Sequence, residues 1–349
     1  MKVYQTDPIS DARWSEFLQR HPRASVFHTA AWLEALRNTY GYEPIVFTTS
    51  PPKSELKNAL VFCRINSWLT GLRLVSLPFS DHCEPLCDSV EDWEFLIRYL
   101  QDIFGQEKWK YIELRPIDQD FGQKSKAIGF QSSARYFLHT LSLQPDAGEL
   151  FRSFDKDSVQ RRIERAERAG LIEKCGTSDD LLQEFYNLFV MTRGRHHLPP
   201  IPYAWFENLI RCLDGALEIR VAYKDRTPIA AILTAQFRDV VYFKYGCSKR
   251  QFNKFGATPW LLWKAMLAGK SKGARKFDMG RTQDDHAGLL KFKNHWSPHP
   301  QELVYWKYPH ASTFDSVDGW RLKVAKGIFS CMPGRLRTMT GRLIYRHFG

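Results

Sequence analysis

The chain has 349 residues, of which 44% are hydrophobic, 14% are aromatic and enough are basic to give a formal net charge of +12. This length favours two domains, and the hydrophobic content excludes long disordered stretches. The seven scattered cysteines exclude a disulfide framework, and the sequence offers neither a signal peptide nor the ~20-residue apolar run that spans a bilayer, so we expect a cytoplasmic protein.

The first half of the sequence alternates helix and strand patterns. A helix is predicted in HTAAWLEAL at 28–36, because Thr29 can cap it and its apolar residues recur at helical spacing. Strand-like segments follow at 44–49, 59–65 and 72–77, then a helix at 90–104 and a strand at 110–114.

The second half repeats that order. Helices are predicted around 147–170, 179–193 and 202–213, and strands at 217–223, 228–237, 239–245 and 302–308. We therefore predict a tandem pair of α/β domains, 1–146 and 147–309, followed by a basic helical tail at 310–349.

The stretch 240–296 has the order of a βαβ unit. The strand 240–245 leads to a loop that ends in Gly256-Ala257-Thr258-Pro259, and a helix, the short strand 276–279 and a second helix follow. Thr258 suits the N-cap, Pro259 the first helical position, and Gly256 a close backbone approach. N–H groups at such a helix start can hold a phosphate.

The helix that ends in AERAGL is amphipathic. Its apolar face carries Val159, Ile163 and Ala166, and its opposite face carries an arginine row. Arg162 lies beside the apolar face, so its head could reach into a groove. A solvated arginine face is the alternative.

Longer segments of the sequence carry a family resemblance. YGCS at 245–248 and FDMGRTQDDHAGLLKFKNHW at 277–296 are accompanied by FHTAAWLEAL, SLPFSDHCEPL, RRIERAERAGL, TRGRHHLPP and VAYKDRTPIAAIL. In this order and spacing they resemble the FemAB and BioF2-like branch of the GNAT superfamily, over roughly residues 25 to 308. The resemblance implies two GNAT-like domains, each a mixed β-sheet flanked by helices, of which one usually retains the reaction cleft.

The resemblance implies an N-acyltransferase and suggests candidate catalytic residues. Lys293 matches the Phe-Lys pair that the family places near the reacting carbonyl, where an ammonium would stabilise the oxyanion. The alternative is a surface lysine. Asp278 could act as a base or could lock Arg281 in an ion pair, and Arg281 could position substrate. His286 could take the proton of the amine.

The donor cleft is expected beside the strand that ends in Tyr245 and Gly246, with phosphate near residues 256–258. Tyr245 could bond the substrate or pack in the core. Asn253 and Thr258 stand at the ends of the family's pyrophosphate pattern without matching it. The donor therefore stays open between acyl-CoA and aminoacyl-tRNA, and no tightly bound cofactor is expected.

The first domain is expected to serve the acceptor. SLPFSDHCEPL resembles the family's acceptor-side loop, with Ser80, Asp81 and His82 as candidate contacts. By resemblance the acceptor is an amine in cell-envelope or exopolysaccharide biosynthesis: an amino sugar, a lipid-linked amine or a peptidoglycan precursor. A peptidoglycan precursor as acceptor would make the protein an aminoacyl-tRNA-dependent aminoacyltransferase. The FemAB-type proteins that act on peptidoglycan often carry a long coiled-coil arm, and this sequence has no long heptad segment. A non-catalytic binding protein is the rival class.

Metal and covalent chemistry are not expected. His82, Cys83 and Cys87, or the pair His196 and His197, lack the four-ligand spacing of a zinc site. Cys247 has no identifiable histidine and acid partners at useful spacing.

The tail concentrates positive charge. Residues 320–349 contain seven basic residues and no acidic one. Candidate partners are an anionic membrane at its inner face, a lipid-linked substrate or RNA, including tRNA. Packing of the same helix on the body is the alternative, and the sequence leaves the oligomeric state open.

Overall fold

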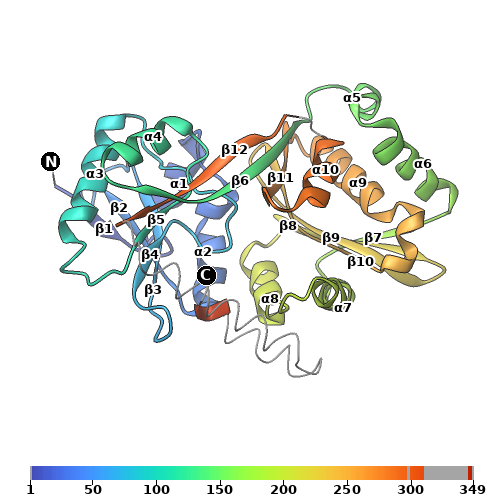
Figure 1. The fold of residues 1–349 in the computed structure, drawn as a ribbon, viewed down its shortest axis with the longest axis horizontal. Helices are drawn as coiled ribbons and strands as arrows, with labels where there is room; N and C mark the ends of the chain where they lie inside the picture. The colour runs from blue at the N-terminus through green and yellow to red at the C-terminus, as the bar shows by residue number, and fades with distance from the viewer. Residues whose placement is uncertain (1, 297–298, 310–344, 348–349) are drawn as a thin grey trace. The chain divides into compact units, whose positions relative to one another are not determined.

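The computed structural model describes residues 2–296, 299–309 and 345–347, which form two compact units (Figure 1). Unit 1 comprises described residues 2–135, 303–309 and 345–347, and unit 2 comprises 136–296 and 299–302. The chain enters unit 2 within strand β6 (Gln131–Ser142) and leaves it within strand β12 (Gln301–Tyr308).

Unit 1 is a mixed sheet flanked by helices. Its strand order is β1 (Tyr4–Thr6), β2 (Glu43–Thr48), β3 (Leu60–Ile65), β4 (Arg73–Val75), β5 (Ile112–Leu114) and β12, in which β4 and β5 run parallel. Its helices include α1 (Arg13–Arg20), α2 (Ala30–Tyr40), α3 (Val90–Ile103) and α4 (Gln119–Ala127). Trp93 and Leu96 of α3 pack in one core with Phe47 and Phe62 of the sheet.

Local signals set the helix starts in unit 1. The Thr29 hydroxyl accepts the N–H of Trp32 at 3.2 Å, which confirms the predicted cap, and α2 ends where Gly41 adopts a φ of +72°. Ser89 caps α3 by accepting the N–H of Asp92 at 3.1 Å. The sequence predictions for α2, α3 and strands β2 to β5 are therefore confirmed within a few residues.

The last predicted strand belongs to a different unit from the one expected. The sequence placed 302–308 in the second domain, but Trp306 of β12 pairs with Leu114 of β5 in unit 1. A strand joins the sheet edge that offers it backbone partners, and position along the chain does not reveal that edge. The long strand β6 and helices α1 and α4 were not predicted.

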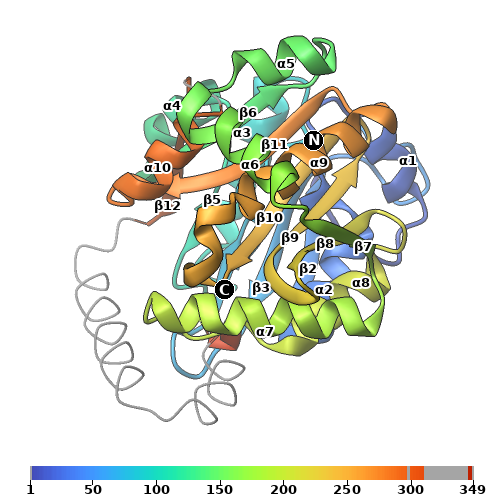
Figure 2. The same ribbon diagram turned by 90° about the vertical axis from the view of Figure 1, so that its right-hand side faces the viewer.

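Unit 2 is also a mixed sheet flanked by helices. Its strand order is β6, β11 (Lys276–Gln283), β10 (Val240–Ser248), β9 (Thr227–Phe237), β8 (Leu217–Lys224) and β7 (Ile172–Gly176). Helices α5 (Ala147–Ser153), α6 (Arg161–Arg168), α9 (Ala257–Ser271) and α10 (Ala287–Asn294) cover one face, and α7 (Asp179–Arg195) and α8 (Tyr203–Cys212) cover the other (Figures 1 and 2).

The helix predicted at 147–170 is broken in the structure. It consists of α5, a π-helical turn at Lys156–Gln160 and α6, with the break at Phe154 and Asp155. The Asp155 side chain accepts the N–H of Ser158 at 2.7 Å, and this local bond competes with a continuous helix. Val159, Ile163 and Ala166 face the core as predicted, and the arginine row is exposed.

Most of the predicted basic tail, 310–344 and 348–349, lies outside the described residues. Tyr345–His347 packs on unit 1, where Thr70 Oγ1 and Arg73 Nη2 donate to the His347 carbonyl at 2.9 and 2.8 Å. Within the part of the chain that the structure describes, no helix combines the length and apolar character that crossing a bilayer requires.

Candidate functional site

The two parallel strands at the centre of unit 2 part from each other halfway along. β10 and β11 pair from Val240 with Lys276 to Tyr242 with Asp278. Beyond that point β10 stays paired with β9 as far as Ser248, and β11 stays paired with β6 as far as Gln283. The two strands therefore diverge after Tyr242 and Asp278, and we call this place the parting.

A bulge on each strand produces the parting. The register of β10 against β9 shifts between Phe243 and Tyr245, and the register of β11 against β6 shifts between Asp278 and Arg281. Such bulges bend a strand and increase its twist. Gly280, with a φ of +70°, supplies the left-handed residue in β11.

Lys293 holds the bulge of β11 from helix α10. Its Nζ donates to the carbonyl oxygens of Gly280 at 2.7 Å and Arg281 at 3.2 Å, and the residue is only 3% exposed. The alternative of a surface lysine is therefore wrong. A buried ammonium at the parting places a positive charge at the open end of the two strands.

The parting turns backbone groups of β10 toward the side that β11 has left. The Lys249 N–H donates to the carbonyl of Ile229 in β9 at 2.8 Å. In an antiparallel ladder the backbone N–H and C=O groups of every second residue are directed away from the paired strand. Gly246, three residues earlier and opposite Ile232, belongs to the outward set and is exposed. An extended ligand could pair with this edge.

Tyr245 points to the opposite face of the sheet from α9. Its ring packs edge-on against Phe189 at 5.6 Å and Phe206 at 5.2 Å, and its hydroxyl accepts the N–H of Trp205 at 2.9 Å. These contacts favour the packing alternative for its side chain, whereas its neighbour Gly246 presents backbone at the parting.

The start of α9 differs from the prediction. Thr258 was expected as the N-cap, but the helix begins at Ala257 with Gly256 as the N-cap, so Thr258 and Pro259 lie inside the first turn. The turn Arg250–Phe255 delivers the chain to Gly256 in a left-handed conformation and starts the helix early. The Gly256 N–H donates to the carbonyl of Asn253, and Pro259 has no N–H. The N–H groups of Ala257 and Thr258 are therefore the first-turn donors that have no partner within the helix.

Gly256 allows helices α6 and α9 to approach each other. Its φ is +73°, and a Cβ atom there would lie 2.2 Å from the carbonyl oxygen of Arg162. The close approach expected toward a donor phosphate is therefore occupied by the backbone of α6. Any role of Gly256 toward a donor stays a prediction.

Positive charge surrounds the start of α9. Arg162 is exposed and its carbonyl packs on Gly256, while Arg165 donates from Nη1 to the carbonyl of Lys254 at 3.2 Å. On the β10 side, Arg195 Nη1 donates to the carbonyl of Ser248 at 3.1 Å. The structure thus brings the backbone of Arg162 to the predicted donor loop, and the basic side chains nearby favour an anionic ligand.

The remaining predicted residues of unit 2 lie around β11 and α10. Asp278 is 4% exposed, and its Oδ1 accepts the N–H of Gly280 at 2.6 Å, which stabilises the bulge. The guanidinium of Arg281 stacks on the ring of Tyr136 at 4.2 Å. His286 is the exposed N-cap residue of α10. Asp278 therefore has a structural task, whereas His286 is open to solvent.

One polar residue of this cluster was missed by the sequence analysis. His139 of β6 is fully buried, and its Nε2 lies 2.7 Å from Oδ1 of Asn294, the last residue of α10. Burial lowers the pKa of His139, the hydrogen bond with Asn294 opposes that shift, and the charge of Lys293 adds to it. Strand β6 was not predicted, so nothing in the sequence connected His139 to Lys293.

The candidate acceptor residues belong to unit 1. The Ser80 hydroxyl donates to the carbonyl of Leu77 at 2.6 Å, and the Asp81 carbonyl accepts the hydroxyl of Tyr305 at 2.7 Å. His82 is 4% exposed and packs edge-on against Phe27 at 5.1 Å. Ser80 and His82 are thus engaged in holding their loop, and their role toward an acceptor stays a prediction.

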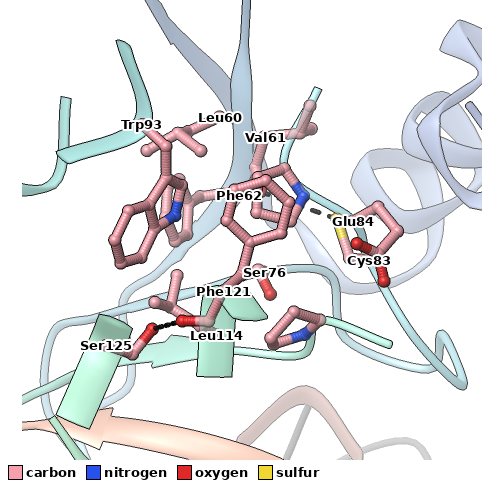
Figure 3. A pocket seen from close by; sticks show the side chains of 12 residues that line it. Leu60, Val61, Phe62, Ser76, Cys83, Glu84, Trp93, Leu114, Phe121 and Ser125 are labelled. Atoms are coloured by element: carbon pink, nitrogen blue, oxygen red, sulfur yellow. Dashed lines mark hydrogen bonds between the residues drawn. The ribbon is translucent and has the colours of Figure 1, made fainter. Parts of the chain in front are cut away.

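Two hollows, one in each unit, lie away from the parting. Unit 1 contains a cavity of about 10 Å³, walled by the rings of Trp93, Phe62 and Phe121 (Figure 3), which is too small for a substrate. Unit 2 contains a hollow of about 340 Å³ lined by Glu218, Lys272 and other residues near the opposite end of β10. We place the candidate site at the parting because strand divergence, the Lys293 charge and the exposed Gly246 backbone meet there.

The possible metal ligands and the Cys247 thiol have defined surroundings in the described residues. Among them, no three His, Cys, Asp or Glu side chains are grouped as a metal ion would require. Cys247 is buried, and burial raises the pKa of its thiol, which disfavours the thiolate that a nucleophile needs.

Comparisons with known proteins match this geometry. The family model described as an acetyltransferase (GNAT) domain matches residues 153–293, which span the parting, the start of α9 and Lys293. No curated protein sequence matches the chain at a significant level.

Solved structures share the fold at low sequence identity. The crystal structure of FemX is 15% identical and superimposes with a TM-score of 0.70 over 91% of this chain and 99% of its own. L-PGS from Bacillus licheniformis is 12% identical, with a TM-score of 0.57 over 91% of this chain and 96% of its own. A tandem GNAT protein from the clavulanic acid biosynthesis pathway is 10% identical, with a TM-score of 0.56 over 89% and 99%. Residues 153–293 therefore match the GNAT acetyltransferase domain, and the chain as a whole shares its fold with FemX and with a tandem GNAT protein.

Proposed function

We propose that unit 2 transfers an acyl or aminoacyl group from an activated donor to an amine. The observation that carries the proposal is the coincidence of the parting with the buried Lys293 ammonium. An open strand edge can pair with the extended part of a donor, and a buried ammonium beside that edge supports our assignment of Lys293 to the reacting carbonyl.

The reaction needs no group beyond the two substrates. The nitrogen of a neutral amine attacks the carbonyl carbon of the donor, and the carbonyl oxygen becomes an oxyanion that Lys293 stabilises. The oxyanion then re-forms the carbonyl as the bond from carbon to the donor's sulfur or oxygen breaks, and the amine nitrogen gives up a proton. The leaving thiolate or alkoxide takes up a proton and departs as a thiol or hydroxyl. His286, exposed at the start of α10, is our candidate acceptor of the proton from the amine.

The donor is either an acyl-CoA or an aminoacyl-tRNA. Both carry phosphate, and Arg165 and Arg195, which donate to the carbonyls of Lys254 and Ser248, supply positive charge near the start of α9 and the end of β10. Arg162, exposed on α6, would add to it. FemX and L-PGS share the fold, and on that analogy we propose an amine acceptor of the cell envelope, either small or lipid-linked. The basic tail would bring the protein to such a lipid, and this part of the proposal concerns residues outside the described ranges.

A panel of donors tests the proposal. Thermal unfolding is followed with acyl-CoAs, an aminoacyl-tRNA mixture and nucleotide sugars, because a ligand of the native state raises stability by about 2.7 kcal/mol at a hundred times its Kd. We expect one of the first two classes to raise the melting temperature, and we expect Lys293→Met to lower transfer about 100-fold. If all three classes leave the melting temperature unchanged, a non-catalytic binding protein becomes the better explanation.

A further inference from the structure

His139 stands at a defined place relative to the bulge of β11. On β6, Thr140 pairs with Asp278 and Leu138 pairs with Arg281, so His139 faces the two bulged residues between them, Met279 and Gly280. Those residues include the carbonyl to which Lys293 donates. The histidine and the lysine therefore approach the same irregular point from two elements.

The hydrogen bond of His139 defines its protonation. An amide oxygen only accepts, so Nε2 carries the proton that bonds Asn294 Oδ1, and in the neutral ring Nδ1 is then the unprotonated nitrogen. Nδ1 is buried and has no hydrogen-bond partner among the described residues. A buried imidazole with one unsatisfied nitrogen is costly for a core position that an apolar side chain could fill, so its presence calls for an explanation.

The bond connects the sheet to the end of α10. Asn294 is the last residue of this eight-residue helix and follows Lys293 directly. A helix this short has little stability of its own, so tertiary contacts must fix its position. A second contact, from the N–H of Asp155 to the carbonyl of His295 at 3.0 Å, holds the same end.

We propose that His139 is a positioning residue that, through Asn294, fixes the Lys293 ammonium on the bulge of β11 at the parting. The effect of this positioning on catalysis rests on the proposed function. Loss of the His139–Asn294 bond should let the end of α10 move and expose Lys293 to solvent.

Chemical modification tests the placement without a substrate. The full-length protein is treated briefly with acetic anhydride, and the acetylation of Lys293 is compared by peptide mass spectrometry with that of Lys291, which is exposed on the same helix. We expect Lys293 to react about tenfold more slowly than Lys291 in the wild type, because reaction requires local opening. Asn294→Ala and His139→Leu should each raise the relative rate about fivefold, whereas His139→Gln, which keeps a donor, should raise it less.

Two controls keep the test decisive. Asn294 is exposed, so Asn294→Ala removes the acceptor without altering the core if His139→Leu fails to fold. Leu233→Ala destabilises β9, where Leu233 is fully buried, and should leave the relative rate of Lys293 unchanged. If Asn294→Ala and a folded His139→Leu both keep Lys293 as protected as in the wild type, the inference is wrong.

Turnover separates this inference from the proposed function. With the donor that the panel identifies, Asn294→Ala should lower kcat several-fold at an unchanged KM, and His139→Gln should keep most of the wild-type kcat. Full turnover in Lys293→Met would overturn the proposed function but would leave the acetylation result standing. An inactive Lys293→Met with unchanged kcat in Asn294→Ala would overturn only the positioning role.

Discussion

Each unit contains a pair of parallel strands, and the two pairs end differently. In unit 1, Ser76 N–H donates to the carbonyl of Glu113 at 2.8 Å, and Arg115 N–H donates to the Ser76 hydroxyl at 2.9 Å, so the chains remain bridged beyond β4 and β5. In unit 2, β10 and β11 separate after Tyr242 and Asp278. The same strand arrangement is thus bridged in one unit and open in the other.

The difference lies in a few residues at the strand ends. Arg115 is 7% exposed, and it donates to the Leu77 carbonyl at 2.6 Å and pairs with Glu113 at 2.7 Å. In unit 2 the diverging strands carry a bulge each, and Gly246 of β10 is exposed beyond the bulge of its strand. The comparison shows how one unit can serve as scaffold while the other keeps an accessible edge.

The largest effect is expected from Lys293→Met. Loss of the positive charge should lower turnover about 100-fold, and loss of the bonds to Gly280 and Arg281 should lower the free energy of unfolding by about 1–3 kcal/mol. Turnover per folded molecule and urea unfolding measure the two effects, with Lys291→Met as the exposed control. Wild-type turnover in folded Lys293→Met would contradict the open end of unit 2 as the reaction site.

Arg115→Met should disrupt the bridge between the chains beyond β4 and β5 in unit 1. It removes the 2.7 Å ion pair of the buried Glu113 carboxylate, whose pair with Lys307 is longer at 3.6 Å, so the free energy of unfolding should fall by about 3 kcal/mol. Donor binding at unit 2, measured by calorimetry, should not change. Adding Glu113→Gln to Arg115→Met should recover part of the lost stability. If Arg115→Met alone is as stable as the wild type, the bridge does not contribute to stability.

Acid should lower the free energy of unfolding of unit 1 through His28. Its Nε2–H donates to the carbonyl of Glu84 at 3.0 Å, and burial lowers the pKa of His28 to about 3. The unfolded chain binds this proton near pH 6.5, so stability from neutral His28 is complete above that pH and decreases as the pH falls toward 3. Between pH 6.5 and 5 we expect a loss of about 2 kcal/mol.

A matched variant isolates the contribution of His28. In His28→Gln the free energy of unfolding should depend less on pH over this range, when urea unfolding of both proteins is compared at pH 7, 6 and 5. Parallel pH dependences in the two proteins would assign the acid sensitivity to other groups, such as His139, whose pKa is also lowered by burial.

The smallest effect concerns the charge beside the open end. Arg162→Ala should weaken donor binding about threefold, because exposed charges contribute less than about 1 kcal/mol, and added salt should reduce the difference. Arg168→Ala, further along the same exposed row, is the control and should bind the donor as the wild type does. Equal affinities for all three proteins would place the phosphates away from α6.

The sequence predicted those parts of the fold that depend on neighbouring residues. The start of α2 follows from Thr29 and the start of α3 from Ser89, and strands β2 to β5 and β10 follow from short apolar runs. The order strand, helix, strand, helix from 240 to 294 was also predicted. Caps and periodicity act within a few residues, so a single sequence displays them.

Features that depend on distant pairing were missed or misassigned. β6 carries a mostly polar, partly exposed pattern that does not mark it as a strand, and β12 could be assigned to unit 1 only once its partner β5 was known. The prediction of Thr258 as the N-cap of α9 was wrong, because the N-cap is Gly256. Gly256 contacts the backbone of Arg162, about ninety residues away in the chain.

By itself, the sequence determined the two α/β halves, the family resemblance and the identity of Lys293 as a candidate. The tertiary structure decided that Lys293 is buried, that the strands beside it diverge, and that His139 and Asn294 meet its helix. Local propensity and capping are encoded in adjacent residues, whereas bulge register, burial and side-chain partners arise only when strands and helices from separate parts of the chain pack together.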